Sequence, residues 1–149
     1  MSIYNFAKNM YLIELRDDAQ EVDLGSFTKT DTIQLKYARI FVYLKGSFSN
    51  ESITLYLKNG ATTYSSTFNL SDVDMGSDDW IGWLRFDFNM EFLADGETYD
   101  MSAITTNYTR TPTKDISISY DFPVVENEDQ TGGCCYTDYG IKFKLFGGI

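Results

Sequence analysis

The sequence predicts an all-β fold, an antiparallel β-sandwich of eight or nine strands in a jelly-roll-like arrangement. Residues 84–92 alternate strictly between apolar and polar side chains, which is typical of a strand with one buried face. Several other segments repeat this period of two, with turn residues between them at short intervals, and no segment has a convincing helical pattern. We therefore expect one sandwich domain spanning residues 1–149, in which residues 1–28 could form an N-terminal arm or an edge-strand extension.

The first two expected strands are residues 10–16 and 21–27. The first places Tyr11, Ile13 and Leu15 on one side and ends at two aspartates. Gly25 weakens the second, because glycine inside a strand offers no side chain for packing.

Residues 32–45 form the longest β-prone segment, and the side on which its apolar residues lie changes midway. The inward positions are odd at first and then even: Ile33, Leu35, Tyr37, Ile40, Val42 and Leu44. A slip of one residue near Ala38-Arg39, as in a β-bulge, explains this change. Alternatively, both sides of the strand are covered beyond residue 39, since Phe41 and Tyr43 are also apolar.

Residues 52–58 and 62–70 are predicted to pair as a hairpin. Asn59-Gly60 lies between them, and this dipeptide is the strongest short-range hairpin signal. The acidic segment 71–79 that follows is predicted to be a loop.

The strand at residues 84–92 is predicted to face the interior with five large apolar side chains: Leu84, Phe86, Phe88, Met90 and Phe92. Such a face needs a second sheet to cover it. Asp95-Gly96 then predicts a turn into a partner strand at 97–105. Residues 115–122 and 139–146 are the last two expected strands, with an irregular segment over 123–133.

The charge and hydropathy of the chain exclude some classes of partner. With 22 acidic and 12 basic residues, the net charge is −10, which argues against binding a nucleic-acid backbone. No apolar run approaches the roughly 20 residues that span a bilayer, so no membrane association is expected. The N-terminal segment also lacks the pattern of a secretory signal, so we expect that the protein either leaves the cell by another route or stays inside until the cell opens.

The residue types available for catalysis are few. The chain has no histidine, so a serine or cysteine nucleophile would have no imidazole to activate it. The two cysteines, Cys134 and Cys135, are adjacent, which disfavours a disulfide between them and leaves a soft-metal site short of ligands. We expect that the protein is not an enzyme and that it needs no cofactor.

The acidic loop offers candidates for a calcium site in Asp72, Asp74, Asp78 and Asp79, because alternating carboxylates supply the oxygen ligands that calcium prefers. The spacing does not match an EF-hand loop. A solvated loop that binds nothing is the expected alternative.

Trp83 is the candidate binding residue that the alternation singles out. It shares the outward side of its strand with Arg85, and Ile81, Tyr56 and Tyr43 could extend the same apolar surface. An outward tryptophan beside polar groups could stack on a sugar ring, anchor a neighbouring protein, or be covered by a loop of its own chain.

Two phrases carry a resemblance to a known family. Leu93 to Tyr99 reads L-A-D-G-E-T-Y, and Asp138 to Phe146 contains the run G-I-K-F-K-L-F. With a tryptophan-led strand before the first phrase, the span 33–146 resembles the galactose-binding-like jelly-roll modules. The resemblance implies a jelly roll more directly than an activity.

Modules of this kind recur as carbohydrate-binding domains and in bacteriophage tail and capsid-surface proteins. The resemblance therefore implies a virion protein made in the host cytoplasm, a capsid decoration or tail accessory subunit. Its expected partners are copies of itself and other virion proteins. The alternative that it implies is a carbohydrate-binding module that recognises a host surface glycan through Trp83.

Overall fold

The computed structural model describes residues 11–29, 32–73, 79–120, 134–136 and 142–148. The described strands and one short 3-10 helix are β1 (Tyr11–Glu14), β2 (Val22–Thr28), β3 (Ile33–Lys45), β4 (Ser52–Asn59), β5 (Thr62–Asn69), η1 (Leu70–Asp72), β6 (Trp80–Leu93), β7 (Thr98–Thr106), β8 (Asp115–Tyr120), β9 (Cys134–Tyr136) and β10 (Lys142–Gly148). The all-β prediction is confirmed. The described residues contain ten strands rather than eight or nine, because the three-residue β9 carries no alternation that would reveal it.

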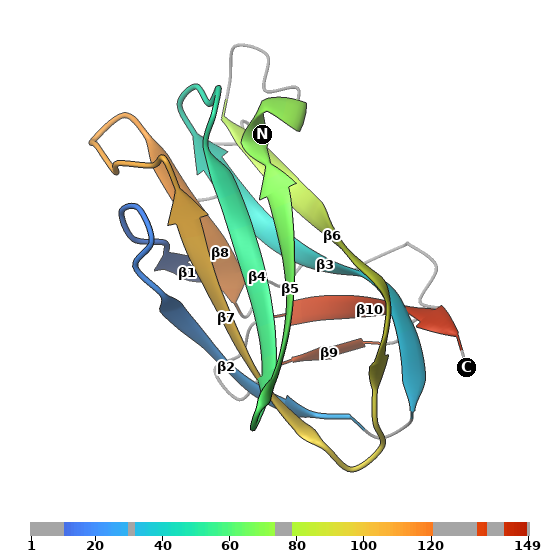
Figure 1. Ribbon diagram of the computed structural model, residues 1–149. Helices are drawn as coiled ribbons and strands as arrows, with labels where there is room; N and C mark the ends of the chain where they lie inside the picture. Colours follow the sequence, from blue (N-terminus) through green and yellow to red (C-terminus); the bar gives the residue numbers. More distant parts are fainter. Residues whose placement is uncertain (1–10, 30–31, 74–78, 121–133, 137–141, 149) are drawn as a thin grey trace.

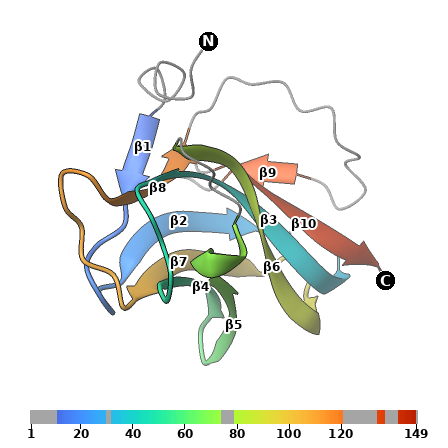
Figure 2. The same ribbon diagram turned by 90° about the horizontal axis from the view of Figure 1, so that it is seen from above.

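The strands form two antiparallel sheets that pack face to face, as Figures 1 and 2 show. The four-stranded sheet has the order β2-β7-β4-β5. In the six-stranded sheet, β3 is the central strand: β6 pairs along one side, while β10 and β8 divide the other side between them. β1 then adds to β8, and β9 adds to β10. The antiparallel sandwich is therefore present, whereas the jelly-roll order of its strands stays a prediction.

Residues 11–28 supply an edge strand to each sheet. β1 pairs with β8, and β2 pairs with β7. Leu15 and Leu24, which come from this segment, are 1% and 0% exposed. This part of the chain therefore contributes to the core; residues 1–10 lie outside the described residues.

The core fills the space between the two sheets. β3 contributes Leu35, Ala38, Ile40, Val42 and Leu44; β4 contributes Ile53, Leu55 and Leu57; β6 contributes Leu84, Phe86, Phe88 and Leu93; β7 contributes Tyr99, Met101 and Ala103. Each set lies on one side of its strand, because successive side chains of a strand point to opposite sides of the sheet. Burial of this apolar surface supplies the main driving force for folding.

The predicted bulge in β3 is present, and it lies slightly earlier than expected. Phe146 of β10 pairs with Tyr37 of β3, and the next residue, Gly147, pairs with Leu35. Lys36 is therefore the extra residue of β3. Tyr37 consequently lies on the outer side of the sheet and not on the inner side. Beyond the bulge, Phe41 and Tyr43 are 7% and 6% exposed, so both sides of β3 are covered there as well. The two alternatives drawn from the sequence are both correct.

β6 contains a second irregularity that the alternation did not predict. Asn89 has φ 54°, a left-handed conformation, and the register with β3 shifts between Asp87 and Glu91. The inward side therefore changes from even to odd positions. Phe92, predicted to be buried, is 56% exposed on the outer side. Glu91, a polar position between the predicted inward residues, turns toward the interior and buries its Oε2. The side chain of Met90 lies outside the described residues.

The β4–β5 hairpin is confirmed, with a turn shifted by one residue. Asn59 pairs with Thr62, so Gly60 and Ala61 form the two-residue loop. Gly60 has φ 53° at the first loop position, which is where a type II′ turn requires glycine.

Two buried polar groups fix the end of the sandwich that carries the loop between β7 and β8. Glu51, 3% exposed, pairs with Lys114 and accepts hydrogen bonds from the backbone N–H groups of Ser49 (2.8 Å) and Asn50 (3.1 Å). Tyr108, 1% exposed, accepts a hydrogen bond from the backbone N–H of Ile116 at 3.1 Å. These contacts satisfy polar groups that would otherwise be costly to bury.

Candidate interaction surface

The outer side of the six-stranded sheet brings arginine and aromatic side chains together through direct cross-strand pairing. On β3 and β6, Arg39 lies opposite Arg85, Phe41 opposite Trp83, and Tyr43 opposite Ile81. On β3 and β10, Tyr37 lies opposite Phe146. Opposed side chains of antiparallel strands are close neighbours, so the register itself assembles the surface. We call it the arginine–aromatic face, made of Tyr37, Arg39, Phe41, Tyr43, Ile81, Trp83, Arg85 and Phe146.

A stack of flat groups lies at the centre of this face. The rings of Tyr37 and Phe146 are parallel within 11°, with centroids 4.5 Å apart. The guanidinium carbon of Arg85 lies 3.8 Å from the centroid of Tyr37, and that of Arg39 lies 5.2 Å from the centroid of Phe146. Each cation–π contact is worth about 0.5–1 kcal/mol at an exposed site. These contacts hold two arginines side by side despite their like charge.

Asp87 orients the exposed arginine of the stack. Its Oδ1 accepts a hydrogen bond from Arg85 Nε at 2.8 Å, and the two side chains are 62% and 46% exposed. A surface ion pair of this kind adds little stability. It restricts the rotamers of Arg85, however, so that a partner meets a guanidinium already in position.

The rest of the arginine–aromatic face is more deeply covered. The Trp83 ring packs edge to face on Phe41, at 85° and a centroid distance of 5.1 Å. The Tyr43 hydroxyl donates a hydrogen bond to Asp79 Oδ2 at 2.7 Å. This half of the face is therefore fixed in place. In the other half Phe146 is also buried, and Arg85, 46% exposed, is the accessible side chain.

Four of the five predicted binding candidates, Trp83, Ile81, Tyr43 and Arg85, lie together on the arginine–aromatic face. Tyr56 does not join them, because β4 belongs to the other sheet. Its ring lies 5.2 Å from the Nζ of Lys58 on the outer side of the four-stranded sheet.

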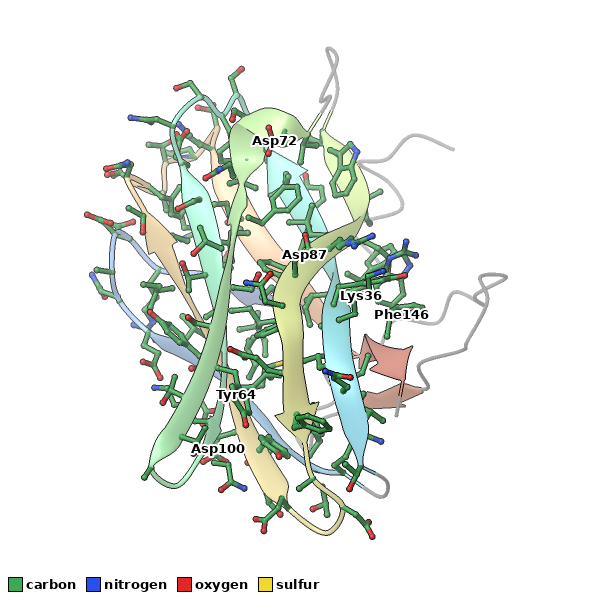
Figure 3. All side chains as sticks on the ribbon, turned by 45° about the vertical axis from the view of Figure 1, so that its right-hand side comes forward. Lys36, Tyr64, Asp72, Asp87, Asp100 and Phe146 are labelled. Carbon is green, nitrogen blue, oxygen red and sulfur yellow. The ribbon has the colours of Figure 1, made fainter. Side chains whose placement is uncertain are left out.

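Sequence reasoning missed four residues of this region. Tyr37 and Phe92 were assigned to the interior, and the two bulges bring them to the outside. Arg39 and Phe146 depend on the pairing of β3 with β10, strands separated by about a hundred residues of chain. Lys36 lies beside them at the bulge, and Figure 3 shows Lys36, Asp87 and Phe146 grouped next to β3.

Among the described residues, this region carries more basic than acidic side chains. Lys36, Arg39 and Arg85 share the outer side of the six-stranded sheet with Asp87, which pairs with Arg85, and with Asp79, which accepts a hydrogen bond from Tyr43. The net charge of the protein is −10. A cationic, aromatic surface on an acidic protein suits an acidic partner and would speed its association by electrostatic steering.

The predicted calcium site is only partly visible. Asp72 is exposed at the end of η1, and Asp79 accepts the hydrogen bond from Tyr43; Asp74 and Asp78 lie outside the described residues. Within the part of the chain that the structure describes, no three acidic or cysteine side chains are grouped as a metal site. The side chains of Cys134 and Cys135 also lie outside it. Across the same described ranges, no helix has the length and hydrophobicity required to cross a bilayer.

Comparisons with protein-family models, with curated proteins and with solved structures found no match to this chain. The resemblance to galactose-binding-like modules therefore stays a prediction from the sequence.

Proposed function

We propose that this protein is a non-enzymatic structural protein that acts through protein–protein contacts of the arginine–aromatic face. The observation that carries the proposal is the stack of Arg85, Tyr37, Phe146 and Arg39 on the outer side of the six-stranded sheet, in which Arg85 is 46% exposed and Phe146 is buried. Arginine and aromatic residues are the types enriched at the energetic centres of protein interfaces. Because the stack is already ordered, a partner would lose little side-chain entropy on binding.

The setting we propose is a bacteriophage particle, in which the protein is a capsid decoration or tail accessory subunit. The supporting argument is the resemblance to jelly-roll modules that recur in such proteins. Adhesion would come from the arginine–aromatic face.

Recognition of a host surface glycan is the second candidate function. It is favoured by Trp83, which is partly exposed beside Arg85 on the outer side of β6. An indole next to a hydrogen-bond donor could stack on a sugar ring and bind its hydroxyls.

The test is co-sedimentation of purified protein with particles from a phage whose gene for this protein has been deleted. We expect wild-type protein to bind the particles and Arg85→Ala to bind them at least about tenfold more weakly, as for loss of an interface arginine. Arg110→Ala is the matched control, because Arg110 is 49% exposed and ion-paired at an end of the sandwich.

Failure of wild-type protein to bind the particles would refute the proposal, as would equal binding by Arg85→Ala. A glycan array decides the second candidate. Binding to a glycan that is lost in Trp83→Ala would support glycan recognition, and a blank array would remove it.

A further inference from the structure

The outer side of the four-stranded sheet carries an acidic recess of about 380 Å³ where β2 bulges against β7. The carboxylates of Glu21, Asp23 and Asp100 line it, together with Lys58 and Ser102. Lys58 pairs with Glu21 at 2.8 Å, which leaves the recess with an excess of negative charge.

The recess is built by a local distortion of β2. Gly25 has φ 94°, and the register between β2 and β7 shifts between Asp23 and Gly25. The Gly25 N–H donates a hydrogen bond to Asp23 Oδ1 at 2.9 Å, and Ser26 Oγ donates one to Asp100 Oδ1 at 2.5 Å. These bonds fix both carboxylates, so the negative charge is held in place.

A buried hydroxyl also lines the recess. Ser102 is 4% exposed, and its hydroxyl lies beside the Glu21 carboxylate, whose pKa is lowered by hydrogen bonds from Lys58 and from Ser102. The hydroxyl oxygen can still accept a hydrogen bond from a donor that enters the recess from outside. A guanidinium, which has five N–H donors, can bind this oxygen and the carboxylates together.

We propose that the acidic recess of one copy receives Arg85 of a second copy, so that the protein associates head to tail. The arginine–aromatic face and the recess lie on opposite outer sides of the sandwich. In Figure 3, Asp100 lies on the side of β7, away from the group of Lys36, Asp87 and Phe146. The two surfaces have opposite charge, and both belong to every copy. This inference rests on the proposed function and specifies one partner for the same face.

The geometry determines the type of assembly. An interface between two different surfaces of the same protein is heterologous, so each copy keeps one surface available for the next. Such contacts produce closed rings when the rotation between copies allows it and open filaments when it does not. Exposed Phe92, which is on the same outer side as Arg85, would add apolar area to the contact.

The experiment measures association by sedimentation velocity for wild-type protein and for the charge-reversed variants Arg85→Glu and Asp100→Arg. We expect wild-type protein to form oligomers as its concentration rises. Association should weaken between about 0.01 M and about 1 M salt, where the Debye length falls from roughly 30 Å to roughly 3 Å. Each variant alone should associate more than about tenfold more weakly, as for loss of a buried charge pair.

Mixing the two variants is the decisive step. Arg85→Glu keeps its recess and Asp100→Arg keeps its arginine, so an equimolar mixture should restore association, with copies of the two variants alternating. The double variant Arg85→Glu/Asp100→Arg should recover self-association, because the charges are exchanged. Arg110→Glu, which reverses an arginine of similar exposure away from both surfaces, should associate like the wild type.

Several results would overturn the inference. Wild-type protein that stays monomeric at its highest attainable concentration refutes it, and so does a mixture of the two variants that does not restore association. Dimerisation of Asp100→Arg alone would mean that the arginine–aromatic face meets itself. Particle binding is measured separately, so a monomeric protein that still binds particles would refute only this inference. An oligomer that fails to bind them would refute only the proposed function.

Discussion

Two phenylalanines of β6 provide a direct test of the bulge at Asn89. Simple alternation places Phe86 and Phe92 on the same side of the strand. The structure places them on opposite sides, with Phe86 2% exposed against the four-stranded sheet and Phe92 56% exposed on the outer side. Replacing each by alanine should therefore have very different effects on stability.

The expected magnitudes follow from burial. Phe86 packs within the core, with the ring of Phe68 6.0 Å away, so Phe86→Ala removes a buried ring and leaves a cavity. Such changes cost about 3–5 kcal/mol. Less than half of Phe92 is withdrawn from water, and full burial of such a side chain contributes about 1.5–3 kcal/mol, so Phe92→Ala should cost about 1 kcal/mol or less.

The assay is urea unfolding followed by tryptophan fluorescence and far-UV circular dichroism. We expect a large fall in the midpoint concentration for Phe86→Ala and a small one for Phe92→Ala, with the slope of the transition unchanged in both. In a thermal melt, Phe86→Ala should lower Tm by roughly 6–20 °C. If Phe92→Ala destabilises the protein as much as Phe86→Ala does, the bulge is absent and the assignment of the two sides of β6 is incorrect.

Three further predictions concern buried polar groups. Burial raises the pKa of Glu91 above 4.5, so the folded protein loses stability as pH rises and this carboxyl group ionises. In urea unfolding, Glu91→Gln should therefore be more stable than wild type at pH 7, with no advantage below about pH 4. Burial works to raise the pKa of Glu51, but hydrogen bonds from Lys114 and the Ser49 N–H hold that pKa below 4.5. The ionised carboxylate therefore stabilises the fold, and acid titration of the wild type should show this stabilisation being lost as pH falls below 4.5. Lys114→Met should cost about 3–5 kcal/mol of unfolding free energy at pH 7, because it leaves the buried charge of Glu51 without its partner. Burial raises the pKa of Tyr108 from 10.0 to about 12, so its contribution to stability is present below pH 10 and is lost as pH rises above that value. At neutral pH, Tyr108→Phe should lower the free energy of unfolding by about 1–3 kcal/mol, because the Ile116 N–H loses its hydrogen-bond acceptor. An unchanged urea midpoint would contradict this role of the Tyr108 hydroxyl.

Much of the fold could be predicted from period-two alternation, because one buried side imposes that pattern directly. Leu84, Phe86 and Phe88 are buried as expected. Phe92 was assigned wrongly because the bulge depends on the backbone conformation of Asn89, and the residues on both sides of it keep alternating in type. A left-handed asparagine leaves little trace in such a pattern.

The candidate surface was only half predictable for a different reason. Alternation indicates which side of a strand faces outward, and this was sufficient for Trp83 and Arg85. It does not indicate which sheet a strand joins, so Tyr56 could not be separated from them. Tyr37 and Phe146 become neighbours only through the pairing of β3 with β10, which is a long-range contact.

The left-handed turn at Asn89 also bears on how the protein avoids aggregation. β6 is 14 residues long, and the pairing described for it is with β3 along one side only. A long straight edge of this kind would be a template for strands of other molecules and could seed amyloid-like fibrils. The kink interrupts the row of backbone donors and acceptors near the middle of the strand. Side-by-side fusion of sheets is thereby discouraged, and the edge of the sandwich stays compatible with a high protein concentration.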